Sequence, residues 1–474
     1  MRLVGLAPRA RTARVSIMFE FLKQPITLKR PASKASGTPV ETPPSKASGT
    51  PAESAPTAAS GTPADSAPTK ASRTSVKTPR SKASSAAAKA VRRRRSSVPA
   101  ASARPRRGVP RAKRTRNLVG LEIEPGQLIA VQSRMNGHIV VERAAGQPIA
   151  PNLVRDGEVS DIDGLSSALS DLFDGSGLDR RVRIGIANQR IVMRQIELPP
   201  ITDPKELDSA VQFQAQDEIP MPIESVVLDY HPLGITETPA GPRMQVLLVA
   251  ARRDMVERML LAARQAGLRP EGVDLAAFGM IRALRPPDSA DGEQILYLSI
   301  GGLTNLAIAS GSTCQFTRVI TTGVEQIVAE VAASAGVPLA DARRMIISAA
   351  ASTADAPDVA ALVVPSSDNV AAAAAADHDE LSRSAMADGI RRIASEVRNS
   401  LDFHLSSHGD VPVSRAVLTG PALDLPGFDL ALGRELGLPL TRGAVALASP
   451  GAAGHVPMSR LAVAAGLSLS EGPQ

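Results

Sequence analysis

The chain is poor in aromatic residues and in cysteine. Its 474 residues include no tryptophan, two tyrosines, eight phenylalanines and the single cysteine Cys314. One cysteine excludes an intramolecular disulfide and suits a reducing compartment. Cys314 lies in a predicted turn after Gly311-Ser312, where we expect a small buried side chain rather than a nucleophile.

Long apolar runs are also missing. No uninterrupted stretch of the sequence reaches the ~20 apolar residues that a membrane-spanning helix needs. The first 30 residues are rich in arginine but lack a continuous apolar core and a small-residue cleavage site, which argues against a secretory signal. The patch Met18–Leu22 suits either a small amphipathic anchor or an unstructured leader, and either Met1 or Met18 can be the start. We therefore expect a cytoplasmic protein.

Acidic residues are scarce in residues 1–117, which hold 26 Lys and Arg but only 4 Asp and Glu, a net charge of +22. The rest of the chain holds 28 basic and 43 acidic residues, a net charge of −15. The pentad Ala-Ser-Gly-Thr-Pro begins at Ala35, Ala47 and Ala59, a period of 12 residues. Because such a composition buries too little apolar surface to offset the entropy of ordering, residues 1–116 are predicted to be a disordered basic tail.

The tail ends in a cluster of basic residues between Arg92 and Arg116 that contains no aromatic residue. Without a platform on which bases can stack, and because attraction to phosphate carries no sequence information, no specific nucleic-acid partner is expected. The charge instead favours peripheral association with an anionic membrane surface.

The chain does contain one strand pattern twice. Residues 294–322 hold three short runs of alternating apolar residues, with Gly301-Gly302 at the first turn, and residues 117–143 hold three more. Superposing the two stretches places Leu121–Ile123 on Leu298–Ile300 and Ile129–Val131 on Leu306–Ile308. Two such meanders predict a duplicated, two-lobed α/β protein.

Helix signals lie between and after the meanders. Asp203-Pro204 predicts the N-terminus of a helix over residues 205–218, and Asp254 is expected to cap another helix. A stripe of apolar residues predicts the strongest helix over about 381–405. Residues 348–377 are rich in alanine with weak periodicity, which is typical of a variable insertion.

Residues 198–233, LPPITDPKELDSAVQFQAQDEIPMPIESVVLDYHPL, resemble the signature of the PilM family. That family is the actin-like cytoplasmic component of the type IV pilus assembly platform. The shared features are the Leu-Pro turn, the helix from Glu206, the Ile-Pro-x-Pro-Ile break and the strand around Asp229. With Ser400–Phe403 and Leu461–Leu467 in the same order, the resemblance covers about residues 117–469.

The resemblance implies two actin-like (ribonuclease H-like) lobes around a nucleotide cleft, with an inserted FtsA-type subdomain. It also implies ATP with Mg²⁺ as cofactor, a PilN-like cytoplasmic peptide and other platform and motor proteins as partners, and a place at the cytoplasmic face of the inner membrane. The expected segments are 117–180 for the start of the first lobe, 181–268 for the inserted subdomain, 269–292 for the return to the first lobe, 293–336 for the start of the second lobe, 337–412 for its upper part with the insertion 348–377, 413–457 for its end, and 458–474 for a C-terminal helix that returns to the first lobe.

The same resemblance points to two glycine-rich turns that would hold nucleotide phosphates. Where the family tends to carry Asp-Ile-Gly, this chain has Glu122-Ile123-Glu124, and Pro125 then removes a backbone donor. At the second turn Ser299 replaces the expected Asp. We therefore expect ATP to bind weakly or not at all. The candidate cofactor-binding residues are Glu122, Gly126, Gly301, Gly302, Thr304, Asn305 and Gly420.

The leading interpretation is a pilus-platform scaffold with a degenerate nucleotide site and no catalytic residue. One alternative is an active actin-like ATPase or sugar-kinase relative, which the missing Asp and the absence of a catalytic base disfavour. Another is an FtsA-type membrane-tethered assembly protein, and the turns can also be plain sheet corners. His404 and His408 have the i, i+4 spacing of metal ligands, but no third ligand is evident, so no metal site is predicted.

Overall fold

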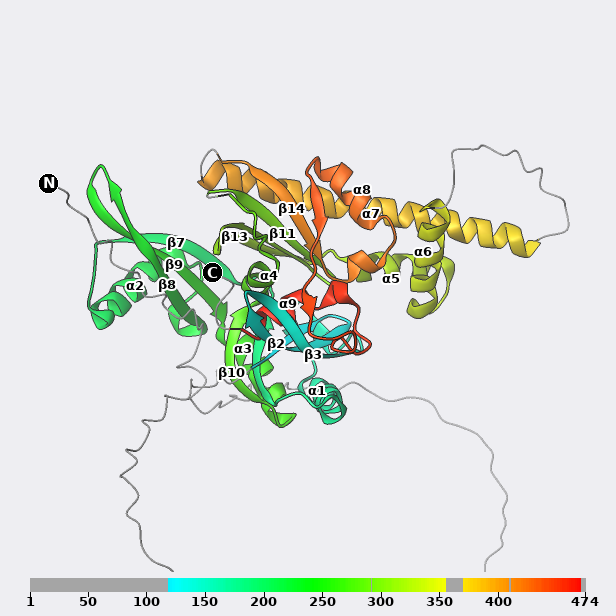
Figure 1. The fold of residues 1–474 in the computed structure, drawn as a ribbon, viewed down its shortest axis with the longest axis horizontal. Helices are drawn as coiled ribbons and strands as arrows, with labels where there is room; N and C mark the ends of the chain where they lie inside the picture. The colour runs from blue at the N-terminus through cyan, green and yellow to red at the C-terminus, as the bar shows by residue number, and fades with distance from the viewer. Residues whose placement is uncertain (1–117, 291, 355–369, 409–410, 470–474) are drawn as a thin grey trace, which may run out of the picture. The chain divides into compact units, whose positions relative to one another are not determined.

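The computed structural model describes residues 118–290, 292–354, 370–408 and 411–469 (Figure 1). In its first sheet, β1 to β3 form an antiparallel meander, and β6 and β10 continue the sheet in parallel with β1. The strand order is β10 (Arg269–Leu275), β6 (Arg181–Ile186), β1 (Val119–Glu124), β2 (Gln127–Asn136), β3 (His138–Pro148) and β16 (Ala446–Leu447).

The second sheet repeats this arrangement. Its meander, β11 to β13, is antiparallel, β14 lies parallel to β11, and β15 lies parallel to β14. The order is β13 (Thr313–Ile320), β12 (Thr304–Ser310), β11 (Gln294–Ile300), β14 (Val413–Thr419) and β15 (Leu440–Arg442). Because meander and parallel strands follow in the same order in both sheets, the predicted duplication is confirmed.

The two meanders differ by one residue at their first turn. Glu124 pairs with Gln127 and leaves a turn of two residues, whereas Ile300 pairs with Thr304 and leaves a turn of three. As a result, Ile129 is the cross-strand partner of Glu122, but Asn305 is the partner of Ser299. The sequence superposition that placed Ile129 on Leu306 is therefore wrong by one position after the turn.

A three-stranded antiparallel sheet, ordered β7 (Val192–Leu198), β9 (Gly241–Arg252) and β8 (Val226–Thr238), is inserted after β6. The helix α2 (Pro204–Glu218) packs on it through Leu207, Val211 and Ala215. Asp203 Oδ1 accepts the amides of Lys205 at 2.9 Å and Glu206 at 3.0 Å, which confirms the predicted N-cap.

Two helix predictions need correction. The helix α3 (Arg253–Gln265) follows β9 directly with Arg252 at the N-cap, so Asp254 lies inside the first turn and pairs with Arg252. The long helix α7 (Val370–His408) begins before residue 381, and α6 (Leu339–Ala354) extends past residue 348. The predicted insertion is thus partly helical, and residues 355–369 lie outside the described residues.

Residues 1–117, on which the prediction of a disordered tail falls, lie outside the described part of the chain. No helix within the described ranges has the length and apolar character needed to cross a bilayer. The other elements are β4 (Val154–Arg155), β5 (Glu158–Val159), α1 (Ile162–Ser176), η2 (Ile223–Ser225), α4 (Ala276–Leu284), α5 (Val324–Ala335), η3 (Pro421–Asp424), α8 (Phe428–Leu436), η4 (Met458–Arg460) and α9 (Ala462–Leu467).

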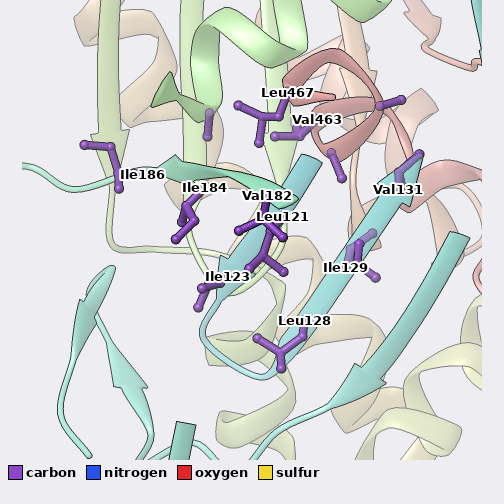
Figure 2. Packing of buried hydrophobic residues seen from close by; sticks show 14 of the residues in the cluster. Leu121, Ile123, Leu128, Ile129, Val131, Val182, Ile184, Ile186, Val463 and Leu467 are labelled. Atoms are coloured by element: carbon purple, nitrogen blue, oxygen red, sulfur yellow. The ribbon is translucent and has the colours of Figure 1, made fainter. Parts of the chain in front are cut away.

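The core of the first sheet is closed by α9. Every residue of β1 is buried. Val463 and Leu467 of α9 lie on one face of β1 and β6, and the buried side chains of Leu121 and Ile184 point from the opposite face (Figure 2). A Cβ atom added to Gly120 would collide with the carbonyl oxygen of Ala464 in α9, so the α9 backbone lies directly on β1. This packing brings η4, which precedes α9, close to the β1–β2 turn.

Candidate functional site

The turn between β1 and β2 lies against the turn between β11 and β12. A Cβ atom added to Gly302 would collide with the carbonyl oxygen of Pro125, and one added to Gly301 would collide with Glu124 Oε2. Glycine permits this close approach because it has no side chain. The two turns that were predicted to hold phosphates are therefore in direct contact.

Glu124 reaches from the first turn into the second. Its carboxylate accepts a hydrogen bond from the backbone N–H of Gly302 and another from Nε2 of Gln127 at 3.2 Å. The N–H of Gly301 donates to the carbonyl oxygen of Leu303 at 2.8 Å. Both glycine N–H groups, which are the donors that a phosphate would use, are thus engaged within the protein.

Burial dominates the electrostatics of the two carboxyl groups in the first turn. Glu124 is 5% exposed, and loss of solvation raises its pKa to about 7. The charge of Glu325 adds to this rise, whereas the hydrogen bond from Gln127 and the charge of Arg460 oppose it. Burial and the charge of Glu124 also raise the pKa of Glu122 well above its usual value. The protonated form of each carboxyl group is favoured in this dry environment.

Arg460 connects the first turn to the second sheet. Its Nη1 donates to Oε1 of Gln127 at 2.9 Å, and its Nε donates to Oδ2 of Asp424 at 2.7 Å. The hydroxyl of Ser459 donates to Oδ1 of Asp424 at 2.6 Å. Sequence reasoning missed Arg460 and Asp424, because no local pattern marks a contact between residues 333 positions apart.

Beside these side chains lies a gap too narrow to hold a water molecule, far below the ~300–1,000 Å³ of typical small-molecule pockets. Glu122, Ser299, Gly420 and Arg460 are among the residues that line it. Gly420 has a φ of 93°, and its N–H donates to the carbonyl oxygen of Ser459 at 2.7 Å. The backbone donor of this third predicted element is therefore also engaged.

Gly126, Thr304 and Asn305, which were also predicted to belong to the site, do not line this gap. Gly126 forms the tip of the first turn, and a Cβ added to it would lie 3.7 Å from the Glu325 side chain. The buried hydroxyl of Thr304 donates to the carbonyl oxygen of Thr322 at 2.7 Å. Asn305, which was predicted to belong to the second turn, lines a separate hollow instead.

That second hollow has a volume of about 80 Å³ and lies where the chain passes from β6 to β7 and where β12 and β13 approach α4. Its lining includes the apolar side chains of Ile186, Ile191, Leu275 and Val319. Asn305 is 3% exposed, and its Oδ1 has no hydrogen-bond partner among the described residues. An unpaired buried acceptor beside apolar side chains suits a ligand that brings a hydrogen-bond donor.

The sequence predicted no metal site at His404 and His408. His404 is buried, and its Nε2 lies 2.7 Å from Oε1 of Gln294. The side chain of His408 lies outside what the structure describes. Over the ranges given for the fold, no group of three or more His, Cys, Asp or Glu residues is arranged to hold a metal ion.

Two sheets of the same strand order, facing each other through their first turns and carrying an inserted subdomain, define an actin-like ATPase fold. The chain is PilM-like: residues 121–353 match the family model described as type IV pilus assembly protein PilM.

One solved structure supports this assignment, and two others are more distantly similar. A chain of a PilM–PilN type IV pilus biogenesis complex is 25% identical, with a TM-score of 0.59, and the match covers 74% of this chain and 97% of that one. The ethanolamine utilization protein EutJ from Carboxydothermus hydrogenoformans is 15% identical over 75% of this chain and 90% of its own, with a TM-score of 0.43. MreB 5 of Spiroplasma citri is 12% identical over 69% and 92%, with a TM-score of 0.39.

Proposed function

We propose that this chain is a scaffold of the type IV pilus inner-membrane assembly platform, peripheral to the cytoplasmic face of the membrane, and that it binds the cytoplasmic tail of a PilN-like protein. The observation that carries the proposal is the similarity to nearly the full length of a chain from a PilM–PilN complex. Other platform and motor proteins are proposed as partners because the sequence resembles the PilM family.

The hollow beside Asn305 is the proposed site for the PilN-like peptide. An extended peptide presents apolar side chains together with backbone N–H donors, and this hollow offers apolar walls and the unpaired Oδ1 of Asn305. β7 and β13, which lie at the edges of their sheets, are linked nearby in the fold by the hydrogen bond from Gln195 Nε2 to Gln315 Oε1 at 3.2 Å.

Fluorescence anisotropy with a labelled peptide from the cytoplasmic tail of the PilN-like protein tests both parts of this proposal. The full-length chain is expected to bind saturably, and Asn305→Leu is expected to weaken binding about tenfold, because one buried hydrogen bond is lost. Asn136→Leu, at the exposed end of β2, is the matched control. Failure of the wild-type chain to bind would reject the PilN-like tail as a partner. Undiminished binding by Asn305→Leu would reject the hollow beside Asn305 as the binding site.

We also propose that ATP with Mg²⁺ binds weakly or not at all. The residues present do not fit a magnesium nucleotide, because the glycine N–H groups of the second turn are engaged, the buried carboxyl group of Glu122 lines the gap and that of Glu124 enters the second turn. An active actin-like ATPase would require these donors to be available. Tight binding of ATP with Mg²⁺ to the wild-type chain in a calorimetric titration would favour that alternative.

The basic tail is proposed to support peripheral membrane association. Its net charge of +22 is expected to bind vesicles that contain anionic lipid and to release them as ionic strength rises. Flotation of the full-length chain with anionic and with neutral vesicles tests this. Equal recovery with both kinds of vesicle would reject an electrostatic attachment.

A further inference from the structure

The carboxylate of Glu124 occupies the position in the second turn where a bound anion would lie. Backbone N–H groups in a glycine turn form a concave site for anions. Here the N–H of Gly302 donates to the Glu124 carboxylate, and a Cβ atom on Gly301 would collide with Oε2 of the same group. The anion-binding position of one lobe is thus filled by a side chain of the other.

We infer that Glu124 is a built-in acceptor group that fills the Gly301-Gly302 turn and holds the two lobes closed without a ligand. A carboxyl group offers acceptor oxygens to an N–H group as a phosphate does. Nε2 of Gln127 donates a hydrogen bond to Oε2 of Glu124 at 3.2 Å, and Nη1 of Arg460 donates one to Oε1 of Gln127 at 2.9 Å. This inference deepens the proposed weak nucleotide binding and is independent of the PilN-like partner.

The close packing of the turns supports the inference independently of charge. Gly302 lies so close to Pro125 that not even a methyl group fits between them. Because Oε2 of Glu124 lies equally close to Gly301, a phosphate group can enter the second turn only if Glu124 leaves it and Pro125 shifts. Glu124→Gly removes the side chain from the second turn.

Hydrogen–deuterium exchange and calorimetry on the full-length chain test this inference, with inorganic pyrophosphate and ATP with Mg²⁺ as probes. In the wild-type chain we expect residues 300–304 to be protected without ligand and neither probe to bind saturably. In Glu124→Gly we expect exchange of these residues to become at least tenfold faster, and protection to return when either probe is added. Binding of at least one probe should become at least tenfold tighter.

Asp274→Asn is the matched control, because Asp274 is a buried carboxylate that pairs with Arg282 on α4. It is expected to change stability without creating a site for either probe. If Glu124→Gly fails to fold by circular dichroism, Glu124→Gln keeps the side-chain size and weakens the acceptor, so exchange of the Gly302 amide should become about tenfold faster.

Three results would overturn the inference: free exchange of residues 300–304 in the wild-type chain, tight binding of ATP by the wild-type chain, or a folded Glu124 variant with unchanged exchange. Binding of the PilN-like peptide by the wild-type chain is measured in parallel. Failure of the folded wild-type chain to bind the peptide would count against the proposed partner and leave the role of Glu124 unaffected.

Discussion

Arg460 Nη1 donates a hydrogen bond to Oε1 of Gln127 at 2.9 Å, although the two residues are 333 positions apart. Through Asp424, the same guanidinium is tied to the segment that follows β14. One side chain near the end of the chain thus links the first turn of the first sheet to the second sheet. The position of the two turns relative to each other depends on this link and on Glu124.

Arg460→Ala is expected to lower the free energy of unfolding by about 2–3 kcal/mol, because it leaves the partly buried Asp424 and Gln127 without their charged partner. Chemical denaturation measures this change. Arg344→Ala, which removes an exposed ion pair with Asp341, is the control and should change stability by less than about 0.5 kcal/mol. Equal effects of the two substitutions would contradict a linking role for Arg460.

Stability is expected to fall as pH rises from about 4.5 to above 7, through the titration of Glu124. Its pKa is raised to about 7 by burial, with Glu325 adding to the rise and Gln127 and Arg460 opposing it. The folded chain keeps this proton in a range where the unfolded chain has released it, so raising the pH favours unfolding.

Glu124→Gln should reduce that pH dependence by up to roughly 3 kcal/mol across the range. Unfolding of both proteins by denaturant at a series of pH values measures the contribution of Glu124 together with its effect on the pKa of Glu122, because all histidines remain in the variant. Parallel curves for the two proteins would show that Glu124 does not titrate in this window.

Gly466→Ala is expected to lower the free energy of unfolding by about 2–3 kcal/mol, since the added methyl group would collide with the carbonyl of Gly279 in α4. Gly175→Ala, in α1 with open space around it, should instead stabilise the chain by about 0.5–1 kcal/mol. Thermal and chemical unfolding of the two variants compare the same substitution in opposite environments. A neutral Gly466→Ala would mean that α9 does not pack on α4 as described.

Cys314 is expected to react with an aromatic disulfide reagent at least a hundredfold more slowly in the folded chain than in denaturant. Burial raises the pKa of its thiol to about 12, so almost no thiolate is present at neutral pH. Absorbance of the released thiolate follows the reaction. Rapid labelling of the native chain would contradict both the burial and the expectation that Cys314 is not a nucleophile.

Local patterns in the sequence predicted most of the secondary structure. Alternating apolar residues marked both meanders, because in a strand every second side chain faces the same side. Asp203 before Pro204 marked the start of α2 through a contact two or three residues away. The Asp254 cap failed because β9 continues to Arg252 and leaves Asp254 inside the helix, a boundary that a single polar residue does not determine.

By itself, the sequence determined the duplicated α/β design, the inserted subdomain and the unusual acidic residue in the first turn, since each is expressed in neighbouring residues. Only the tertiary structure placed Glu124 in the second turn, Arg460 beside Gln127, and Asn305 in a separate hollow. These contacts depend on how the two sheets meet and on the one-residue difference between the two hairpins. A shift of one residue in the pairing of two strands moves a side chain to the opposite face of the sheet. The local sequence pattern does not predict this shift when the two turns differ in length.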